Sequence, residues 1–310
     1  MDTTAKGKIL KGVGGLYTVR IYPDGALAPQ EVRCKARGSF RHENLTPLPG
    51  DTVELSRSGE DGGYVIEKIC ERRNALIRPP MANLDYLFVT MAAASPAPIL
   101  PTVDKLICIA EHNNIEPVVI ITKCELDRAR ADELRAIYSV CGFDCFALSS
   151  KQNEGIEPLE EFVSSKLPSH IAAFAGASGI GKSTLLNRLF PELCLATSEI
   201  SRKIERGRHT TREVTLFPLS DAPDCGYIAD TPGFSMLDFK RFDFFEKDDL
   251  VDTMREFADF VGNCKYTKCS HTKEEGCAVI RAVKDGKIPL SRHTSYVELY
   301  DILKTRKKWD

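Results

Sequence analysis

The chain has 310 residues, of which 43% are hydrophobic, and this is enough for two or three domains with buried cores. Its 42 Lys and Arg residues nearly balance 44 Asp and Glu residues, which excludes a globally basic nucleic-acid binder. The eleven cysteines are an odd number, and residues 1–8 contain no apolar signal core. We therefore expect a cytoplasmic protein without disulfides. The longest apolar stretch, 86–94, is too short to span a bilayer.

The N-terminal part has the alternation and the turn signals of a small β-barrel. Short strand-like runs lie at 17–22, 31–35, 51–55 and 64–69, separated by Gly- and Pro-rich turns. Four or five short strands in so few residues predict a closed all-β barrel of the oligonucleotide-binding (OB) type, which we place at 1–72.

One predicted strand and loop of this barrel is basic. Its cations surround an aromatic ring, Phe40, and they are Arg33, Lys35, Arg37 and Arg41. Basic side chains interleaved with an aromatic ring are typical of a surface that binds single-stranded RNA. The alternative, equally compatible with these residues, is the solvated polar face of an ordinary barrel.

The pattern changes after a linker, 72–80, whose paired prolines continue neither a strand nor a helix. Strand-like and helix-like segments then alternate, which predicts a parallel sheet with helices on both faces. We expect strands at 86–91, 117–122, 145–148, 170–175 and 226–229, and helices at 103–112, 129–141, 156–167 and 182–190. This central α/β domain is predicted to span 73–241.

A glycine-rich segment between a strand and a helix fits the phosphate-binding pattern of Gly, four residues, then Gly-Lys-Ser. Its residues are Gly176, Ala177, Ser178, Gly179, Ile180, Gly181, Lys182, Ser183 and Thr184. The glycines let successive N–H groups turn toward an anion, and the helix N-terminus presents its positive end to the same anion. We expect Lys182 to reach the β- and γ-phosphates and the Ser183 hydroxyl to bind Mg²⁺. An ordinary glycine-rich turn is the alternative.

Two switch elements follow the phosphate loop. Asp230-Thr231-Pro232-Gly233 ends a predicted strand, so Asp230 can hold Mg²⁺ through water and the Gly233 N–H can meet the γ-phosphate. Upstream of it, 198–212 is a basic loop that contains His209 and Thr211. A loop of that length predicts a switch whose threonine, Thr211, closes on Mg²⁺ only when the γ-phosphate is present.

The elements that read the base in GTP-binding folds are found upstream of the phosphate loop. Thr122-Lys123-Cys124-Glu125 ends one predicted strand, in place of Asn-Lys-x-Asp, and Ser149-Ser150-Lys151 follows the next, in place of Ser-Ala-Lys. In this order, on consecutive strand ends, they indicate a circularly permuted GTPase. The Glu125 carboxylate can accept from guanine N1–H and N2–H₂, whereas adenine presents a lone pair at N1. The alternative is that Glu125 only caps a loop.

The C-terminal part, 242–310, contains a cluster of possible metal ligands. Three thiolates and one imidazole within fourteen positions satisfy a closed, structural Zn²⁺ site, and they are Cys264, Cys269, His271 and Cys277. Reduced cysteines beside a chance histidine are the alternative. We expect helices at 246–260, 279–284 and 291–307 around it.

The C-terminal helices are basic. Residues 281–310 contain four acidic residues and eight basic residues. The basic residues are Arg281, Lys284, Lys287, Arg292, Lys304, Arg306, Lys307 and Lys308. A basic helical end beside a zinc site suits rRNA. For Lys304 to Lys308, a solvated tail is the alternative.

From residue 8 to about 300, the chain resembles the ribosome small subunit-dependent GTPase A family of circularly permuted GTPases. The resemblance is carried by the permuted motif order, the cysteine cluster and several short segments, namely 14–15, 36–38, 49–51, 73–79, 82–85 and 207–211. It implies an OB barrel, a permuted GTPase domain, a C-terminal zinc domain and a role late in small-subunit maturation. Where the family usually has Asn or Thr first and Asp last in the base-reading motif, this chain has Thr122 and Glu125.

The resemblance also assigns a catalytic role to His209. The residue after Gly233 is Phe234, whereas GTPases such as Ras carry a water-positioning Gln there. An apolar ring cannot orient water, and His209 in the switch loop is the nearest candidate. The alternative is a switch histidine that packs or contacts RNA.

These observations predict a multidomain, Mg²⁺-dependent, monomeric GTPase that hydrolyses GTP to GDP and binds the small ribosomal subunit and its rRNA, without a membrane. Its third basic region would be the switch loop, with Arg202, Lys203, Arg206, Arg208 and Arg212. Hydrolysis would rearrange the switch beside the zinc domain and release the subunit. The alternatives are a non-catalytic, nucleotide-regulated rRNA-binding assembly protein and a P-loop kinase.

Overall fold

The computed structural model describes residues 5–23, 28–42, 45–58, 63–191, 214–230 and 246–305. The chain folds as two compact units, each built from several segments. The first unit comprises Met1–Tyr86, Glu160–Phe174 and Leu186–Phe234, and the second comprises Leu87–Leu159, Ala175–Leu185 and Ser235–Asp310. We describe each unit by itself.

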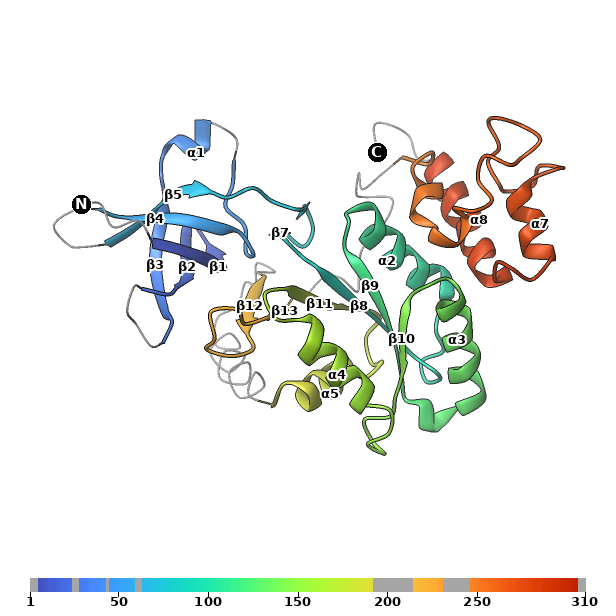
Figure 1. The fold of residues 1–310 in the computed structure, drawn as a ribbon, viewed down its shortest axis with the longest axis horizontal. Helices are drawn as coiled ribbons and strands as arrows, with labels where there is room; N and C mark the ends of the chain where they lie inside the picture. The colour runs from blue at the N-terminus through green and yellow to red at the C-terminus, as the bar shows by residue number, and fades with distance from the viewer. Residues whose placement is uncertain are drawn as a thin grey trace. The chain divides into compact units, whose positions relative to one another are not determined.

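A five-stranded barrel forms the N-terminal part of the first unit (Figure 1). Its strands are β1 (Ala5–Val13), β2 (Leu16–Ile21), β3 (Gln30–Ala36), β4 (Thr52–Ser58) and β5 (Gly63–Ile69), with the short helix α1 (Ser39–His42) after β3. β1 pairs with both β2 and β4, and β3 pairs in parallel with β5, so the sheet closes on itself. The predicted OB-like barrel is confirmed.

Strand β1 was not predicted as a separate strand, because its sequence AKGKILKGV lacks apolar alternation. Glycine is required at position 7 of this strand for a steric reason. A Cβ there would overlap the Val19 and Ile21 side chains and the Arg20 carbonyl. β1 is nevertheless central, because Ile9 is fully buried in the barrel core.

The barrel core corrects one detail of the predicted RNA-facing strand. Phe40 is only 6% exposed and packs in the core, so its ring cannot stack on a base. Arg33 and Lys35 are exposed on β3, whereas Arg37 forms an ion pair with Glu67 at 2.9 Å. The side chain of Arg41 lies outside the described part of the chain.

The barrel continues into a second group of strands in the same unit. These strands are β11 (Ile171–Ala175), β12 (Thr215–Pro218) and β13 (Tyr227–Asp230). β11 runs parallel to β13, β12 is antiparallel to β13, and β12 pairs with the barrel strand β1. The buried Arg20 of β2 fastens this junction, because its guanidinium donates to the Ser220 carbonyl at 2.6 Å and pairs with Asp221.

The predicted linker is more ordered than expected, because it forms a two-stranded ribbon of β6 (Ala75–Leu76) and β7 (Met81–Ala82). Two asparagines hold it. The Asn74 side chain exchanges two hydrogen bonds with the backbone of Leu84, and Asn83 donates to the Gly50 carbonyl of the barrel at 3.0 Å. These side-chain bonds pair backbone groups of Leu84 and Gly50, which flank the ribbon and the barrel.

The second unit contains a parallel sheet flanked by helices, as the alternating pattern predicted. Its elements are β8 (Tyr86–Ala92), α2 (Leu100–His112), β9 (Glu116–Thr122), the 3₁₀ turn η1 (Cys124–Leu126), α3 (Arg128–Val140) and β10 (Asp144–Ala147). Two further helices, α4 (Glu157–Lys166) and α5 (Lys182–Leu189), each have residues in both units. The strand order is β10-β9-β8, and β9 and β10 pair in parallel with Val118 opposite Asp144. Strands β8 and β9 are almost wholly buried.

In the C-terminal part, α7 (Ala278–Lys284) and α8 (Leu290–Thr305) confirm two of the three predicted helices. The expected helix at 246–260 is wrong. Two short 3₁₀ turns, η3 (Leu250–Thr253) and η4 (Arg255–Phe257), replace it. Met254 leaves the helical conformation between them, which turns its sulfur toward Cys108 and directs Arg255 to Glu111. Tertiary contacts with α2 thus override the local helix propensity.

A buried ion-pair cluster holds α8 against α2 and η4. Arg292 is fully buried, and its guanidinium donates to Asp104 and to Glu256, both at 2.7 Å. Tyr138 donates a further hydrogen bond to the same Asp104 oxygen at 2.9 Å. Arg292, which the sequence placed among rRNA-binding cations, is therefore an internal structural residue.

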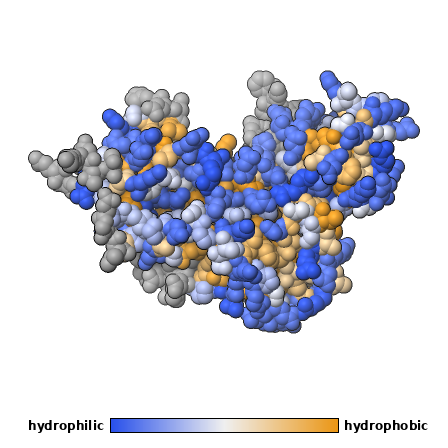
Figure 2. All heavy atoms as spheres, viewed as in Figure 1, coloured by the Kyte–Doolittle hydropathy of each residue, from blue (hydrophilic) through white to orange (hydrophobic). Residues whose placement is uncertain are grey.

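Hydrophilic residues cover most of the face shown in Figure 2, and hydrophobic residues occupy smaller patches. Among the described helices, none combines the length and the apolar character that crossing a bilayer requires.

We predict that Arg292→Leu lowers the free energy of unfolding by about 3–5 kcal/mol, because it leaves two buried carboxylates without a cation. Urea unfolding monitored by circular dichroism measures this loss. The exposed Arg281 of α7 provides the control, and Arg281→Ala should change stability by less than about 0.5 kcal/mol. Equal stability of the Arg292 variant and the native protein would contradict the assignment.

Candidate functional site

The phosphate loop connects the end of β11 to the start of α5. Gly176 has a φ of 141°, and a Cβ there would overlap the Thr90 carbonyl oxygen. This backbone conformation and the close approach both require glycine. Ser183 and Thr184 are exposed in the first turn of α5, where backbone N–H groups have no partner within the helix.

Lys182 folds over the loop. Its ammonium donates to the carbonyl oxygens of Gly176 at 2.7 Å and Ala177 at 2.5 Å. Burial lowers the pKa of this lysine, so the charge is partly desolvated. An ammonium that is held above the loop by neutral carbonyls gains a stronger partner when a phosphate enters.

The predicted base-reading segment lies directly against the phosphate loop. The Thr122 hydroxyl donates to the Ile180 carbonyl at 2.5 Å, and the Lys123 ammonium donates to the Gly179 carbonyl at 2.7 Å. Lys123 also donates to the Ser95 carbonyl at 2.6 Å. These side chains and the carbonyls that they bond are 56 and 58 positions apart in the chain. The segment and the phosphate loop can therefore belong to the same site.

Glu125 presents an acceptor beside this segment. A hydrogen bond from Ser149 is the main cause of the lowered pKa of its carboxyl group, and the nearby Lys151 and Lys123 act in the same direction. Its Oε2 atom is one of the few buried side-chain oxygens in the described part of the chain without a hydrogen-bond partner. An ionised, buried and unpartnered carboxylate oxygen suits the N–H groups of guanine.

The segment after β10 completes this group. Ser149 is buried, and its backbone pairs with that of Glu154 in an isolated antiparallel bridge. Ser150 is partly exposed and Lys151 is exposed, so both can face a ligand.

The switch residues are only partly described. Asp230 ends β13 in the first unit, and desolvation raises the pKa of its carboxyl group. A carboxylate in that condition favours a nearby cation. His209, Thr211 and Gly233 lie outside the described residues, as do the five cations of the switch loop.

A second site lies in the C-terminal part. The ligand atoms of Cys264, Cys269, His271 and Cys277 all lie within 4.8 Å of one another and could hold a metal ion. His271 Nδ1 is 3.5 Å from Cys264 Sγ and 3.4 Å from Cys277 Sγ, and the two sulfur atoms are 3.8 Å apart. Metal–sulfur bonds of about 2.3 Å in a tetrahedron give sulfur–sulfur edges of about 3.8 Å.

Backbone N–H groups point at two of the sulfur atoms of this cluster, whereas burial favours the protonated thiols. Cys277 caps the N-terminus of α7, where Ile280 N–H donates to its sulfur, and the N–H of Ala278 donates to Cys264. Burial raises the pKa of the Cys269 thiol to about 12 and lowers the pKa of His271. A bound metal would displace the thiol protons and use the neutral imidazole.

Sequence reasoning missed the residues that support the cluster. Burial alone would raise the pKa of Glu274, but hydrogen bonds from Ser270 outweigh it and lower that pKa to about 2. The His293 ring bonds the His271 carbonyl at 2.8 Å. Glu274 lies within the ligand spacing and could have been suspected, whereas His293 is brought there only by the packing of α8.

The order of these elements defines the class of protein. The predicted base-reading segments at the ends of β9 and β10 precede the phosphate loop, and the strand that ends in Asp230 follows it. This order, with a five-stranded barrel before it and a Cys/His cluster after it, is that of a circularly permuted GTPase. The family model of the RsgA GTPase matches residues 69–240, and that of the RsgA N-terminal domain matches residues 6–65. The chain belongs to the RsgA GTPase family, which decides against a P-loop kinase.

Relatives agree over nearly the full length. Proteins named small ribosomal subunit biogenesis GTPase RsgA are 40% identical over 309 residues in Enterococcus faecalis and 38% identical over 304 residues in Caldanaerobacter subterraneus. These matches cover 97% and 98% of this chain, and 96% and 97% of the two relatives.

Two solved structures share the fold. YjeQ from Thermotoga maritima has a TM-score of 0.80 at 32% identity, over 98% of this chain and all of that one. YloQ, described as a circularly permuted GTPase, has a TM-score of 0.77 at 32% identity, over 98% of this chain and 96% of that one.

We predict that Glu125→Ala weakens GDP binding by about 1.5–3 kcal/mol, roughly ten- to a hundredfold, because it removes charged hydrogen bonds to guanine. Isothermal titration with GDP and with ADP measures the change. Glu125→Asp keeps the carboxylate and serves as the control, which should retain the preference for GDP. An unchanged affinity of the alanine variant for GDP would show that Glu125 only caps the loop.

Proposed function

We propose that this chain is a Mg²⁺-dependent GTPase that binds the small ribosomal subunit during its maturation, and that its nucleotide state controls association and release. The observation that carries the proposal is the bonding of Thr122 and Lys123 to the phosphate loop, which joins base recognition to phosphate binding. The names of the full-length relatives support the ribosomal role. We further propose a monomer that acts in the cytoplasm, with domains at 1–72, 73–241 and 242–310.

Different residues of the chain would bind the guanine base, the phosphates and the Mg²⁺ ion. Guanine would be bound by Thr122, Lys123, Glu125 and the Ser149–Lys151 segment, and the phosphates by residues 176–184. The donors available to Mg²⁺ are Ser183 at the start of α5, Thr211 and, through water, Asp230, whose raised pKa fits a carboxylate beside a cation. When bound, Mg²⁺ would neutralise charge on the β- and γ-phosphates. Lys182 would exchange its carbonyl partners for phosphate oxygens.

Hydrolysis needs an oriented water. Phe234 cannot orient it, so we assign that role to His209, which would hold the water in line with the γ-phosphate. A histidine on a long loop is effective only when the loop is ordered. We therefore expect slow intrinsic hydrolysis and stimulation by the small subunit.

RNA contacts would come from exposed cations in both units. Arg33 and Lys35 are exposed on the barrel strand β3, and Arg281, Lys284 and Lys287 are exposed around α7. Each can pair with a phosphate while the chain as a whole stays near neutrality. Arg292 is excluded from this set because it is buried.

The metal in the Cys/His cluster would be Zn²⁺. Three sulfurs and one imidazole nitrogen, at distances that fit a tetrahedron, form a donor set that suits zinc and leaves no open position. Its role would be structural, because Cys277 is the N-cap of α7 and His271 is bonded to α8 through His293.

We predict that purified small subunits accelerate GTP hydrolysis, and that His209→Ala lowers the stimulated rate by at least about tenfold. The rate is measured as phosphate release from GTP and from ATP, with and without subunits. Subunits should also bind more tightly to the chain with a non-hydrolysable GTP analogue than with GDP.

Three results would contradict this proposal. One is ATP hydrolysis as fast as GTP hydrolysis, another is a His209 variant with the native stimulated rate, and the third is equal subunit affinity in the two nucleotide states.

We predict one zinc ion per chain and its loss in Cys277→Ser. Serine can still cap α7, so this substitution separates loss of the metal ligand from loss of the helix cap. Zinc is measured by atomic emission, and limited proteolysis should then cleave the C-terminal part faster. Cys70→Ser, outside the cluster, is the control and should keep its zinc. Full zinc content in the Cys277 variant would refute the ligand assignment.

A further inference from the structure

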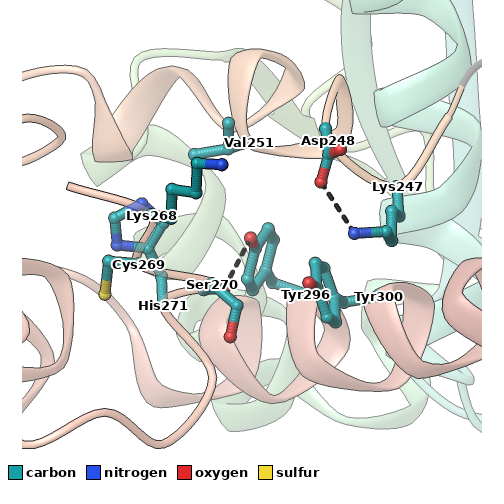
Figure 3. A pocket seen from close by; sticks show the side chains of 9 residues that line it. All are labelled: Lys247, Asp248, Val251, Lys268, Cys269, Ser270, His271, Tyr296 and Tyr300. Carbon is teal, nitrogen blue, oxygen red and sulfur yellow. Dashed lines mark hydrogen bonds and ion pairs between the residues drawn. The ribbon is translucent and has the colours of Figure 1, made fainter. Parts of the chain in front are cut away.

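A pocket of about 500 Å³ lies beside the metal cluster in the second unit, between the η3 segment and α8 (Figure 3). The nucleotide site does not use it, and a closed four-ligand metal site has no open position that would need it. It is lined by Lys247, Asp248, Val251, Lys268, Cys269, Ser270, His271, Tyr296 and Tyr300. Its volume is in the range of sites that bind small organic ligands.

The floor of the pocket is aromatic. Tyr296 is only 1% exposed, and its hydroxyl donates to the Ser270 carbonyl at 2.9 Å while its ring packs edge-on against Phe257. Tyr300, one helical turn further along α8, is 6.1 Å from Tyr296 between ring centroids and is partly exposed. The Lys247 ammonium lies 5.8 Å from the centroid of the Tyr300 ring. An incoming planar group would therefore stack on the part of this ring that Tyr296 and Lys247 leave exposed.

The charges of the pocket are of both signs. Lys247 pairs with Asp248 at 3.0 Å, as Figure 3 shows. Lys268 is exposed on the opposite wall and has no ion-pair partner among the described residues. The Asp248 carboxylate disfavours a densely charged anion such as a polyphosphate or an acidic peptide. One unpaired cation beside an aromatic floor instead suits a ligand with a neutral planar part and a single negative charge.

We propose that this pocket binds a single unstacked nucleotide of the small subunit's RNA, with its base against Tyr300 and its phosphate paired with Lys268. Unpaired bases are bound on aromatic side chains, and stacking on them tolerates any base. The inference rests on the proposed function for the identity of the RNA. A metal in the cluster would also hold one wall of the pocket in place, because Cys269 and His271 belong both to the cluster and to that wall.

The test uses the full-length, zinc-loaded protein and two probes: a short fluorescein-labelled oligouridylate, and purified small subunits with a non-hydrolysable GTP analogue. Tyr300→Ala should weaken binding of both probes by about tenfold, whereas Tyr300→Phe, which keeps the ring, should stay within about twofold. Lys268→Gln should reduce the salt dependence of oligonucleotide binding by about one phosphate contact. Zinc content and thermal unfolding confirm that each variant is folded.

Tyr266 provides the matched control, because it is an exposed tyrosine of the same region that does not line the pocket. The proposal is overturned if Tyr300→Ala binds both probes like the native protein, or if Tyr266→Ala loses as much affinity. If Tyr300→Ala does not fold, an unchanged salt dependence in Lys268→Gln overturns it instead. Weakened subunit binding without any oligonucleotide binding by the native protein would show that the pocket does not take a single unstacked nucleotide and would also refute the proposal.

These outcomes are separable from the proposed function. Stimulation of the native protein's GTP hydrolysis by subunits tests the function without involving Tyr300. If that stimulation is absent, the function fails, while the oligonucleotide measurements still decide the pocket.

Discussion

The hydrogen bonds from Thr122 and Lys123 to the phosphate-loop carbonyls are the interaction on which the nucleotide site depends. They fasten the end of β9 to a loop that lies more than fifty positions further along the chain. A permuted motif order is possible because these contacts depend on which strand ends meet in space and not on which comes first in the chain. Lys123, with a φ of 56°, holds a strained backbone conformation to make its two bonds.

The second unit also connects its sheet to the C-terminal part through buried charge. Arg292 joins α8 to α2 and η4, and Met254 packs its sulfur against Cys108 of the same helix α2. Helix α2 therefore touches both the core of the sheet and the region that carries the Cys/His cluster. The region of the Cys/His cluster and the sheet that carries the predicted base-reading residues are therefore joined through α2 by buried contacts.

The elements that the sequence predicted well are those with a strong local signal. The buried strands β8 and β9 are continuous apolar runs, and the phosphate loop has its glycines and lysine at the required spacing. The ligand spacing of the cysteines likewise brought four side chains together as expected. By contrast, β1 and β12 were missed, because one lacks alternation and the other is a four-residue strand that depends on pairing with its neighbours.

The sequence by itself determined the family and the class of the candidate site, because a phosphate loop, the predicted base-reading residues and the possible metal ligands all have particular residue types at short spacings. The tertiary structure alone decided which basic and aromatic residues are available. Arg292 and Phe40 look like RNA contacts in the chain, yet one is buried between Asp104 and Glu256 and the other lies in the barrel core. Tyr300 and Lys268, which no motif marks, line one pocket. Burial is a property of the packed chain, and local sequence carries little information about which charge will be enclosed.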